Sequence, residues 1–340
     1  MKALIEPLNE LAEYSEAADS LKKSRTPIHI TGCVDTQKCQ LIQALGSGAR
    51  YKVIITYSEA KARELYDDMR LYSHDVYIYP AKDVIFYSAD VHGYAIVQER
   101  MRVMKQLLEG NACTIITTLG SGMERCVPLS NYKEHTLSFK VDEDIELNNL
   151  RKELTALGYE HTAQVETPGS FAIRGGIADI YPLTEEVPYR IELWGDTINS
   201  IHSFDVESQR SIDSVDEIEL YSATEVIIEE GRVISALSSI EADIKKYAGR
   251  FEQENNYEQA GRLRQSFELL KENIDYYKGM AGLESYMCYF YDDTCSFFEY
   301  FPKNETMYYV DEPNRTYEHG EAIEYEFSES MKSRLEKGYI

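Results

Sequence analysis

The sequence predicts an α/β fold that contains a parallel sheet and, between residues 135 and 222, a small α+β domain. Over residues 1–134, short apolar runs alternate with helical patterns, which is typical of β-α-β units. Over residues 135–222, apolar and polar residues alternate at period two, as in antiparallel strands with one face toward water. Residues 223–340 combine helical patterns with one further apolar run. We therefore expect three segments, with bounds 1–134, 135–222 and 223–340.

The first segment contains four candidate strands, at residues 27–31, 51–57, 76–80 and 112–119. The last of these, ACTIITTL, is apolar throughout, as expected of a parallel strand covered on both faces. A helix should begin at Ser58, because Leu65, Met69 and Tyr72 recur at helical spacing. The stretch GYAIVQERMRVMKQLLEG predicts a second helix that ends at Gly110.

The other two segments differ in pattern. In residues 135–222, the stretch TLSFKV predicts a strand, LNNLRKELTALGYEH predicts a helix, and residues 168–205 predict antiparallel strands. Gly175-Gly176 and Gly195-Asp196 supply turn or bulge chemistry between those strands. From residue 223 onward we expect a short strand TEVIIEE, a helical region over about 232–278 and a strand before Asp311. The sequence from residue 316 has weak patterning, and we expect the chain to be a piece of a longer protein.

Composition limits the possible functions. The chain has 340 residues and a net charge of −24, so a nucleic-acid footprint over the whole surface is disfavoured, although a local basic spot is compatible with it. Its six cysteines form no C-x-x-C and its seven histidines show no metal-ligand spacing, so we expect reduced thiols and no bound metal. No secretory signal or apolar run of membrane-spanning length is present. We expect a cytoplasmic protein without membrane contact.

The stretch TGCVDTQKCQ, residues 31–40, has nearly the layout of a phosphate-binding loop, G-x-x-x-x-G-K-[ST]. Gly32 and Lys38 stand in the first glycine and the lysine positions. Gln37 replaces the second glycine and places a side chain where the backbone must approach phosphate. Cys39 replaces the hydroxyl residue, and a thiol is a poor ligand for Mg²⁺. We interpret the loop as degenerate and non-catalytic; weak nucleotide binding is the alternative.

Asp311 and Glu312 follow the apolar run Met307–Val310. An apolar strand that ends in Asp-Glu is the layout of a Walker B element, in which the carboxylates support Mg²⁺ and orient water. The simpler interpretation is a strand end followed by the turn Glu312-Pro313-Asn314. Both interpretations remain open at the level of sequence.

The most specific signal lies in residues 168–210. It contains, in order, R-G-G, D-I-Y-P, Y-R-I-E, G-D-x-I-x-S-I and F-D-V-x-S-Q-R. This stretch closely resembles the second domain of the transcription-repair coupling factor (Mfd) family and of its paralogue, the excinuclease subunit UvrB. The resemblance extends to the whole chain. It implies an incomplete RecA-type, P-loop-like domain in residues 1–134 and 223–340, into which a UvrA-binding domain, residues 135–222, is inserted.

Two features favour the UvrB-like N-terminal module of the Mfd family over UvrB itself. UvrB needs an intact phosphate-binding loop, and here that loop is degenerate. UvrB also has a tyrosine-rich hairpin that clamps DNA, whereas the corresponding stretch here, AKDVIFYSADVHGYAIVQERM, has about the length of a plain connection.

The resemblance also implies which residues contact UvrA. The family's two arginines correspond to Arg174, in the R-G-G turn, and to Arg190, in the Y-R-I-E strand. Its aromatic position corresponds to Trp194, where the family usually has Phe. Arg190, Glu192 and Trp194 alternate and should share one face of the strand, and arginines beside an aromatic ring are typical of interface hot spots. We expect Arg190 to be an exposed charge. The alternative is a pair of surface arginines and a core tryptophan.

The resemblance implies a non-catalytic docking module that recruits UvrA to lesions where RNA polymerase has stalled. No second phosphate-binding loop and no D-E-x-H motif is present, so we expect no cofactor in this chain. ATP and Mg²⁺, and contacts with RNA polymerase and duplex DNA, would belong to other domains of a full-length ATP-driven translocase. Two alternatives are a UvrB-like P-loop ATPase with a divergent nucleotide site and a DNA-binding domain.

Overall fold

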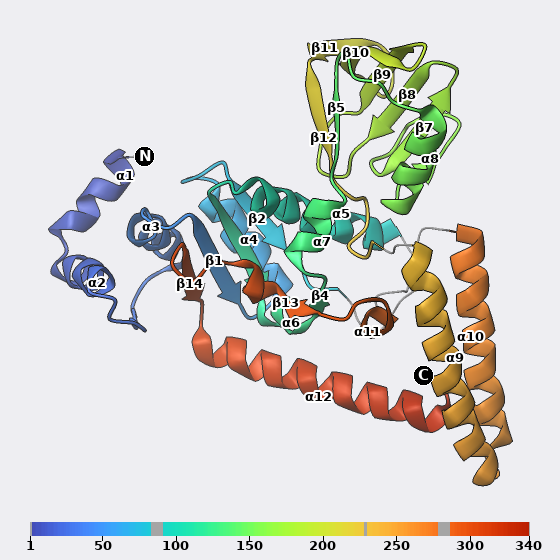
Figure 1. Ribbon diagram of the computed structural model, residues 1–340. Helices are drawn as coiled ribbons and strands as arrows, with labels where there is room; N and C mark the ends of the chain where they lie inside the picture. The colour runs from blue at the N-terminus through green and yellow to red at the C-terminus, as the bar shows by residue number, and fades with distance from the viewer. Residues whose placement is uncertain (1, 83–90, 228–229, 278–285, 340) are drawn as a thin grey trace. The chain divides into compact units, whose positions relative to one another are not determined.

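The computed structural model describes residues 2–82, 91–227, 230–277 and 286–339 (Figure 1). The chain divides into two compact units. The first comprises Met1–Lys82, Glu109–Glu124 and Ser296–Ile323. The second comprises Asp83–Leu108, Arg125–Cys295 and Glu324–Ile340.

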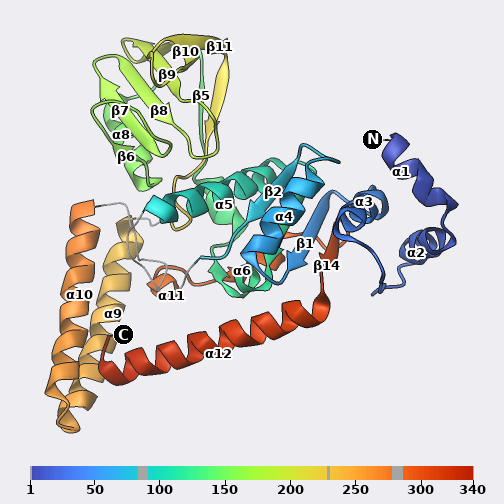
Figure 2. The same cartoon turned by 180° about the vertical axis from the view of Figure 1, so that it is seen from behind.

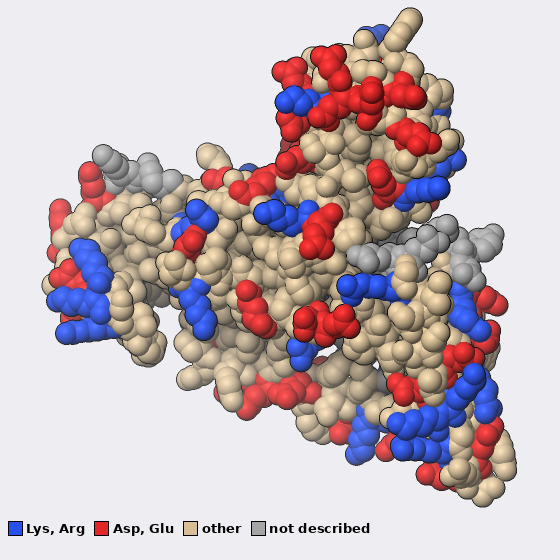
Figure 3. Space-filling view, viewed as in Figure 1, with Lys and Arg blue, Asp and Glu red and all other residues tan. Residues whose placement is uncertain are grey.

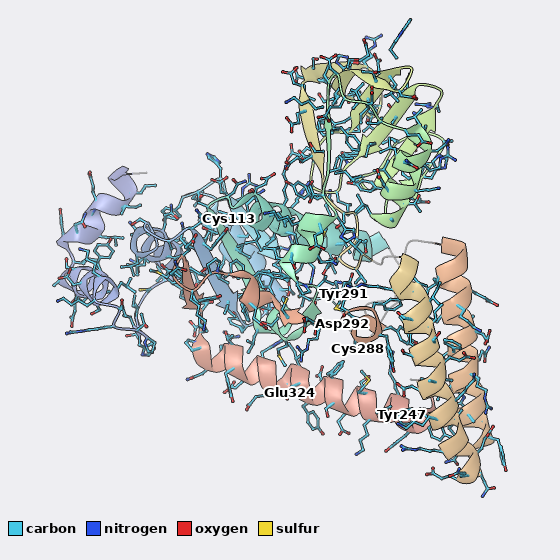
Figure 4. The ribbon with its side chains drawn as sticks, in the orientation of Figure 1. Cys113, Tyr247, Cys288, Tyr291, Asp292 and Glu324 are labelled. Carbon is cyan, nitrogen blue, oxygen red and sulfur yellow. The ribbon has the colours of Figure 1, made fainter. Side chains whose placement is uncertain are left out.

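The first unit is built on a four-stranded parallel sheet. Its strands, in spatial order, are β14 (Thr306–Val310), β1 (Tyr51–Thr56), β3 (Cys113–Thr118) and β2 (Val76–Tyr79). Every residue of β3 is buried, including three threonines, as expected of a parallel strand that is covered on both faces. Figure 4 labels Cys113, the first residue of this strand. The predicted parallel sheet and three of the four strands expected in the first segment are confirmed.

The predicted strand over residues 27–31 is wrong. These residues form no regular element, and all but Ile28 are exposed. A run of five residues does not form a strand by itself, because a strand is stabilised by side-chain pairs with a neighbouring strand. The two lateral sides of β1 are both occupied, by β14 and by β3. The degenerate loop is therefore not preceded by a strand.

Two helices pack against one face of this sheet. On this face, α3 (Asp35–Leu45) and α4 (Glu59–Met69) contribute Cys39, Leu65 and Met69 to a core with the sheet residues Ile54 and Ile116. The predicted start of α4 is confirmed, because the Ser58 hydroxyl accepts a hydrogen bond from the Lys61 amide.

The other elements of this unit include a short aromatic helix. In η3 (Phe297–Tyr300), the ring of Phe297 stacks on Tyr79 of β2 with centroids 3.6 Å apart. The remaining helices are α1 (Lys2–Ile5), η1 (Glu6–Glu10), α2 (Ala12–Lys22) and α6 (Leu119–Met123).

The second unit contains the predicted antiparallel sheet, which Figure 2 shows from behind. Its six strands, in spatial order, are β11 (Ser211–Val215), β10 (Thr197–Phe204), β9 (Tyr189–Trp194), β8 (Ile177–Tyr181), β7 (Ser170–Arg174) and β6 (Glu160–His161). All pairs are antiparallel except β6 with β7. Gly175 and Gly195 adopt positive φ values of 61° and 67° in the two turns, so the predicted turn chemistry is confirmed.

Other elements complete the second unit. The ladder of β5 (Leu137–Lys140) with β12 (Glu217–Leu220) and the helix α8 (Leu147–Ala156) lie in the same part of the chain as the six-stranded sheet. The remaining elements are α5 (Val91–Glu109), β4 (Arg125–Cys126), α7 (Leu129–Glu134), α9 (Glu230–Gln253), α10 (Tyr257–Tyr277), α11 (Met287–Phe290) and β13 (Cys295–Ser296). The helical region over about 232–278 is thus confirmed as two helices.

One further expectation for the last segment is wrong, and one helix was not predicted. Residues 224–227 of TEVIIEE form no strand, although Val226 and Ile227 are buried. The weakly patterned sequence after residue 316 is helical, within α12 (Pro313–Lys337). Its large residues Tyr317 and Tyr325 are exposed, so this helix has no apolar stripe from which a period could be read. Among the described residues, no helix is both long enough and apolar enough to cross a membrane.

Candidate functional site

The degenerate loop keeps the conformation of its first glycine. Gly32 has a φ of 82° and is exposed, and α3 begins three residues later at Asp35. Gln37 lies in the first turn of α3, where its side-chain oxygen accepts a hydrogen bond from the Val34 amide at 3.3 Å. This side chain therefore satisfies one of the free amides of the helix N-terminus, the groups that would otherwise face a phosphate.

The structure brings together Lys38 and the two carboxylates after β14. The Lys38 ammonium lies 2.7 Å from Asp311 Oδ1, 3.1 Å from Glu312 Oε1 and 3.1 Å from Asp35 Oδ1. Asp311 is nearly buried and also accepts a hydrogen bond from the Thr56 hydroxyl at 3.1 Å. Although partial burial of Lys38 acts in the opposite direction, its hydrogen bonds to Asp311, Asp35 and Glu312 raise the pKa of its ammonium. A phosphate would have to compete with these carboxylates for the lysine.

Cys39 of α3 and Lys61 of α4 lie beside this group of charges. Burial raises the pKa of the Cys39 thiol to about 12, and its sulfur lies in the core between α3 and α4. The side chain is thus turned away from the loop and cannot ligate a metal ion there. The ammonium of Lys61 in α4 lies 2.7 Å from Asp35. The hydrogen bonds that Asp35 accepts from Lys61 and, to a smaller extent, from Lys38 lower the pKa of its carboxyl group.

The hairpin comparison made from the sequence falls on the stretch AKDVIFYSADVHGYAIVQERM, of which residues 83–90 lie outside the described residues. In the part of the chain that the structure describes, no group of three or more His, Cys, Asp or Glu side chains could hold a metal ion.

The second candidate site lies on the six-stranded sheet, where Arg190 of β9 stands directly opposite Asp179 of β8. The Arg190 guanidinium donates to the Asp179 carboxylate through Nε at 2.6 Å and through Nη2 at 3.0 Å. It also donates to the backbone and side-chain oxygens of Gln209, at 3.4 and 3.3 Å, and lies 4.6 Å from the ring centre of Phe204. The hydrogen bonds to Asp179 raise the pKa of Arg190.

Arg174 contacts the same carboxylate, and Trp194 lies four residues beyond Arg190 on β9. Arg174, at the end of β7, donates to Asp179 Oδ2 at 2.7 Å and keeps 49% of its side chain exposed. Trp194, at the end of β9, is 85% exposed. Strand register places Arg174, Asp179, Arg190 and Trp194 on one face of the sheet. We call Arg174, Arg190 and Trp194, with Asp179 between the arginines, the Arg–Trp face.

Two of the expectations for this face need correction. Arg190 is not an exposed charge, because only 17% of its side chain reaches solvent and its partner Asp179 is 99% buried. A buried carboxylate requires a cation and hydrogen bonds, so Arg190 is held inward by its position opposite Asp179. The alternative of a core tryptophan is also wrong, since Trp194 is among the most exposed large side chains.

Sequence reasoning missed Asp179, which connects the two arginines. The only signal was the aspartate of D-I-Y-P itself. It alternates with Ala178 and Ile180, which point to the opposite face of β8, so the pattern did not show that Asp179 is a buried aspartate. Such a residue needs a cationic partner on a neighbouring strand. Figure 3 shows acidic side chains over much of the visible face of this domain, and residues 135–222 carry 18 acidic against 6 basic residues. The two arginines are therefore a local exception in an acidic surface.

Comparison with known proteins shows what the chain is similar to. Residues 137–226 match the family model of the UvrB interaction domain. The chain is 30% identical to the transcription-repair-coupling factor of Bacillus subtilis over 289 residues. This alignment covers 84% of this chain and 24% of that protein. The chain is 28% identical to the transcription-repair-coupling factor of Staphylococcus epidermidis over 314 residues. This second alignment covers 92% of this chain and 26% of that protein.

The chain thus spans about a quarter of the length of these relatives. The resemblance inferred from residues 168–210 is confirmed, and so is the expected fold class of an α/β chain with a small additional domain. Over most of its length, the chain is similar to one part of the transcription-repair-coupling factors, and residues 137–226 match the UvrB interaction domain.

Proposed function

We propose that this chain is a non-catalytic docking module of a transcription-repair-coupling factor, and that it recruits the excision-repair protein UvrA through the Arg–Trp face. The match of residues 137–226 to the UvrB interaction domain supports the class of partner. Translocation on DNA and removal of stalled RNA polymerase would then be tasks of the rest of the protein, in which ATP and Mg²⁺ would act.

The exposure of Trp194 is the single observation that carries the proposal. A tryptophan with 85% of its surface in water contributes nothing to the core, whereas its burial by a partner would remove a large apolar area from water. Arg174 lies on the same face with half of its guanidinium side chain free, and can pair with a carboxylate of the partner. Tryptophan and arginine are also the residues most enriched in hot spots.

The experiment is a calorimetric titration that measures the affinity of this chain for purified UvrA. We expect Trp194→Ala to weaken binding by about 2 kcal/mol or more, as truncation of a hot-spot residue does. Arg174→Ala should weaken binding to a smaller extent, because part of its guanidinium is already engaged with Asp179.

Ile212→Ala provides the matched control. Ile212 is 53% exposed on β11, at the far edge of the same sheet, so its truncation removes exposed apolar surface without touching the Arg–Trp face. If Trp194→Ala binds UvrA as the wild type does, or if Ile212→Ala is equally impaired, the assignment of the docking face is wrong.

One observation favours a second function, that of a UvrB-like ATPase with a divergent site. The structure keeps Lys38 in contact with Asp311, the pair that a Walker A lysine and a Walker B aspartate would form. Mg-ATP at one hundred times its Kd would stabilise a binding protein by about 2.7 kcal/mol, which a thermal shift detects. We expect no shift in the wild type; a saturable shift that Lys38→Ala abolishes would show that the loop binds nucleotide and would contradict the interpretation of the loop as degenerate.

A further inference from the structure

A local excess of positive charge lies where the α9–α10 hairpin turns and where α12 ends. Residues 244–264 and 331–339, which we call the basic tip, contain eight Lys and Arg against four Asp and Glu. The rest of the chain then has 27 basic and 55 acidic residues, since the totals are 35 and 59. Figure 3 shows the basic side chains gathered over the lower ends of α9 and α10. The tip is therefore a cationic surface in a strongly acidic protein.

Several acidic residues near the tip are already neutralised. Lys245 pairs with Glu241, Arg264 with Glu252 and Arg262 with Glu258. Four other cations, all exposed, have no acidic partner among the described residues: Lys246, Arg250, Lys332 and Lys337. These four cations are available to an anion from outside.

The end of α12 is fixed to α10 in this surface. Arg262 donates to the backbone oxygen of Lys337 at 3.3 Å, and its guanidinium lies 5.4 Å from the ring centre of Tyr339. Gly338 is buried against Gln259, with a φ of 70°. The cations of α12 and those of the hairpin thus belong to one surface and are not independent tails.

Exposed tyrosines lie among these cations. Tyr247, which Figure 4 labels on α9, has Lys246 and Arg250 near its ring, at 5.3 and 5.1 Å from the centre. Tyr257 and Tyr339 are 64% and 50% exposed. Tyr339 also lines a hollow of about 420 Å³, together with Ser333, Arg334 and Lys337. The hollow thus has a hydroxyl and two cations, which suit a phosphate, and an aromatic ring, which suits a base.

We propose that the basic tip binds single-stranded nucleic acid, with the four unpaired cations along the phosphates and the exposed tyrosines against unpaired bases. Positive charge along the backbone combined with aromatic stacking is the usual mode of single-strand recognition. The net charge of the chain does not prevent this, because charges beyond about 8–10 Å are largely screened at physiological salt. Acidic protein segments would engage the cations but would leave the exposed tyrosine faces without bases to stack on.

The test is fluorescence anisotropy of a labelled single-stranded oligonucleotide with the full 340-residue chain. Four phosphate contacts predict a slope of log K against log salt of about −3, since single strands contribute about −0.7 per contact. Binding should therefore weaken roughly 50-fold between 50 and 200 mM salt. The double reversal Lys246→Glu, Arg250→Glu should lower the affinity at least tenfold and make the slope shallower by about 1.4.

The matched control is Arg151→Glu, Lys152→Glu, which reverses one arginine and one lysine on the exposed side of α8. It changes the net charge by the same amount and should leave the affinity within twofold. Tyr257→Ala tests the stacking separately and should lower the affinity about tenfold, because base stacking on an aromatic side chain is worth about 1–3 kcal/mol. Circular dichroism of each variant establishes that its helices are intact.

Competition distinguishes the partner classes. Unlabelled single strand should displace the probe at a lower concentration than duplex of equal length, and polyglutamate should displace it least. The proposal is overturned if the single strand does not bind at 50 mM salt, if both double reversals weaken it equally, or if polyglutamate or duplex competes as well as the single strand.

Discussion

Arg190 donates two hydrogen bonds, of 2.6 and 3.0 Å, to the carboxylate of Asp179, the residue directly opposite it on β8. Because the Asp179 side chain is 99% buried, this arginine compensates a negative charge inside the domain. Arg190 is at the same time one of the three residues that we propose for docking. A substitution of Arg190 therefore affects both the stability of the domain and the proposed contact with the partner.

We predict that Arg190→Glu lowers the stability of the domain formed by residues 137–226 by about 3–5 kcal/mol, as the loss of one partner of a buried ion pair does. The substitution leaves Asp179 without its main donor and places a second carboxylate opposite it. Hydrogen exchange of the amides of β8 and β9 in increasing urea measures the change within this domain.

Lys140→Glu serves as the comparison within the same domain, since Lys140 is 56% exposed and pairs with the exposed Glu217. Reversal there should change stability by no more than about 0.5–1 kcal/mol. An Arg190→Glu variant as stable as Lys140→Glu would mean that Asp179 does not depend on Arg190.

The sequence predicted the elements that carry their own pattern. β3 has no charged residue, and the sheet residues from 168 to 205 alternate between flanking glycines, so both were identified correctly. Residues 27–31 and α12 were missed for physical reasons. The short run 27–31 could form a strand only with a partner that tertiary structure does not provide, and α12 exposes its large side chains on a largely polar surface.

The candidate sites show the same limit. The types of residue were visible in the sequence, including Lys38, Asp311, Arg174 and Arg190. Their pairings were not, because Lys38 and Asp311 lie 273 positions apart and meet only through the order of the sheet strands. The degree of burial of Asp179 likewise depends on packing across the sheet, which turned Arg190 from an expected surface charge into a partly buried one.

Lys38→Met should lower the stability of the first unit by about 1–3 kcal/mol near neutral pH, because Lys38 is the cation closest to the nearly buried Asp311. The difference from wild type should depend on pH in a defined way. The folded pKa of Lys38 is raised above its ordinary 10.5, so its contribution is fully present below pH 10.5 and is lost as the pH rises through the folded pKa. The folded pKa of Asp35 is lowered below 3.8, so its contribution is present above pH 3.8 and is lost as the pH falls through the folded pKa.

Urea titrations at several pH values check this profile. The gap between wild type and Lys38→Met should be constant from about pH 5 to 9 and should narrow at both extremes. A gap that varies across the neutral range would show that a histidine or another group, and not the Lys38 pairing, controls the stability of this region.

Cysteine reactivity should separate the buried thiols from the exposed one. Burial raises the pKa of Cys39 and of Cys113 to about 12 each, so only about one molecule in ten thousand carries either thiolate at pH 8. Cys288, labelled in Figure 4, is exposed. With iodoacetamide at pH 8, peptide mass spectrometry should find Cys288 modified first and Cys39 and Cys113 only after urea is added. Early modification of Cys39 in the native chain would contradict its place in the core between α3 and α4.

Two glycine-to-alanine substitutions near the basic tip should have effects of opposite sign. Gly338 ends α12 with a φ of 70°, and a β-carbon there would lie 2.6 Å from the backbone oxygen of Gln259. Gly338→Ala should therefore destabilise the last turns of α12 by about 1–2 kcal/mol or more, since both the left-handed conformation and the close approach exclude a side chain. Gly249 lies inside α9 with open space around it, so Gly249→Ala should stabilise that helix by up to about 1 kcal/mol.

Hydrogen exchange measures both effects in the same chain. The amides of Gly338 and Tyr339, which donate to the backbone oxygens of Leu335 and Arg334, should exchange faster in Gly338→Ala than in wild type. Amides of α9 should exchange more slowly in Gly249→Ala. Unchanged exchange at Tyr339 in Gly338→Ala would show that the end of α12 is not anchored on α10, and the cations of α12 would then act independently of those of the hairpin. Because exchange is measured without any nucleic acid, this result tests the architecture of the tip separately from its proposed ligand.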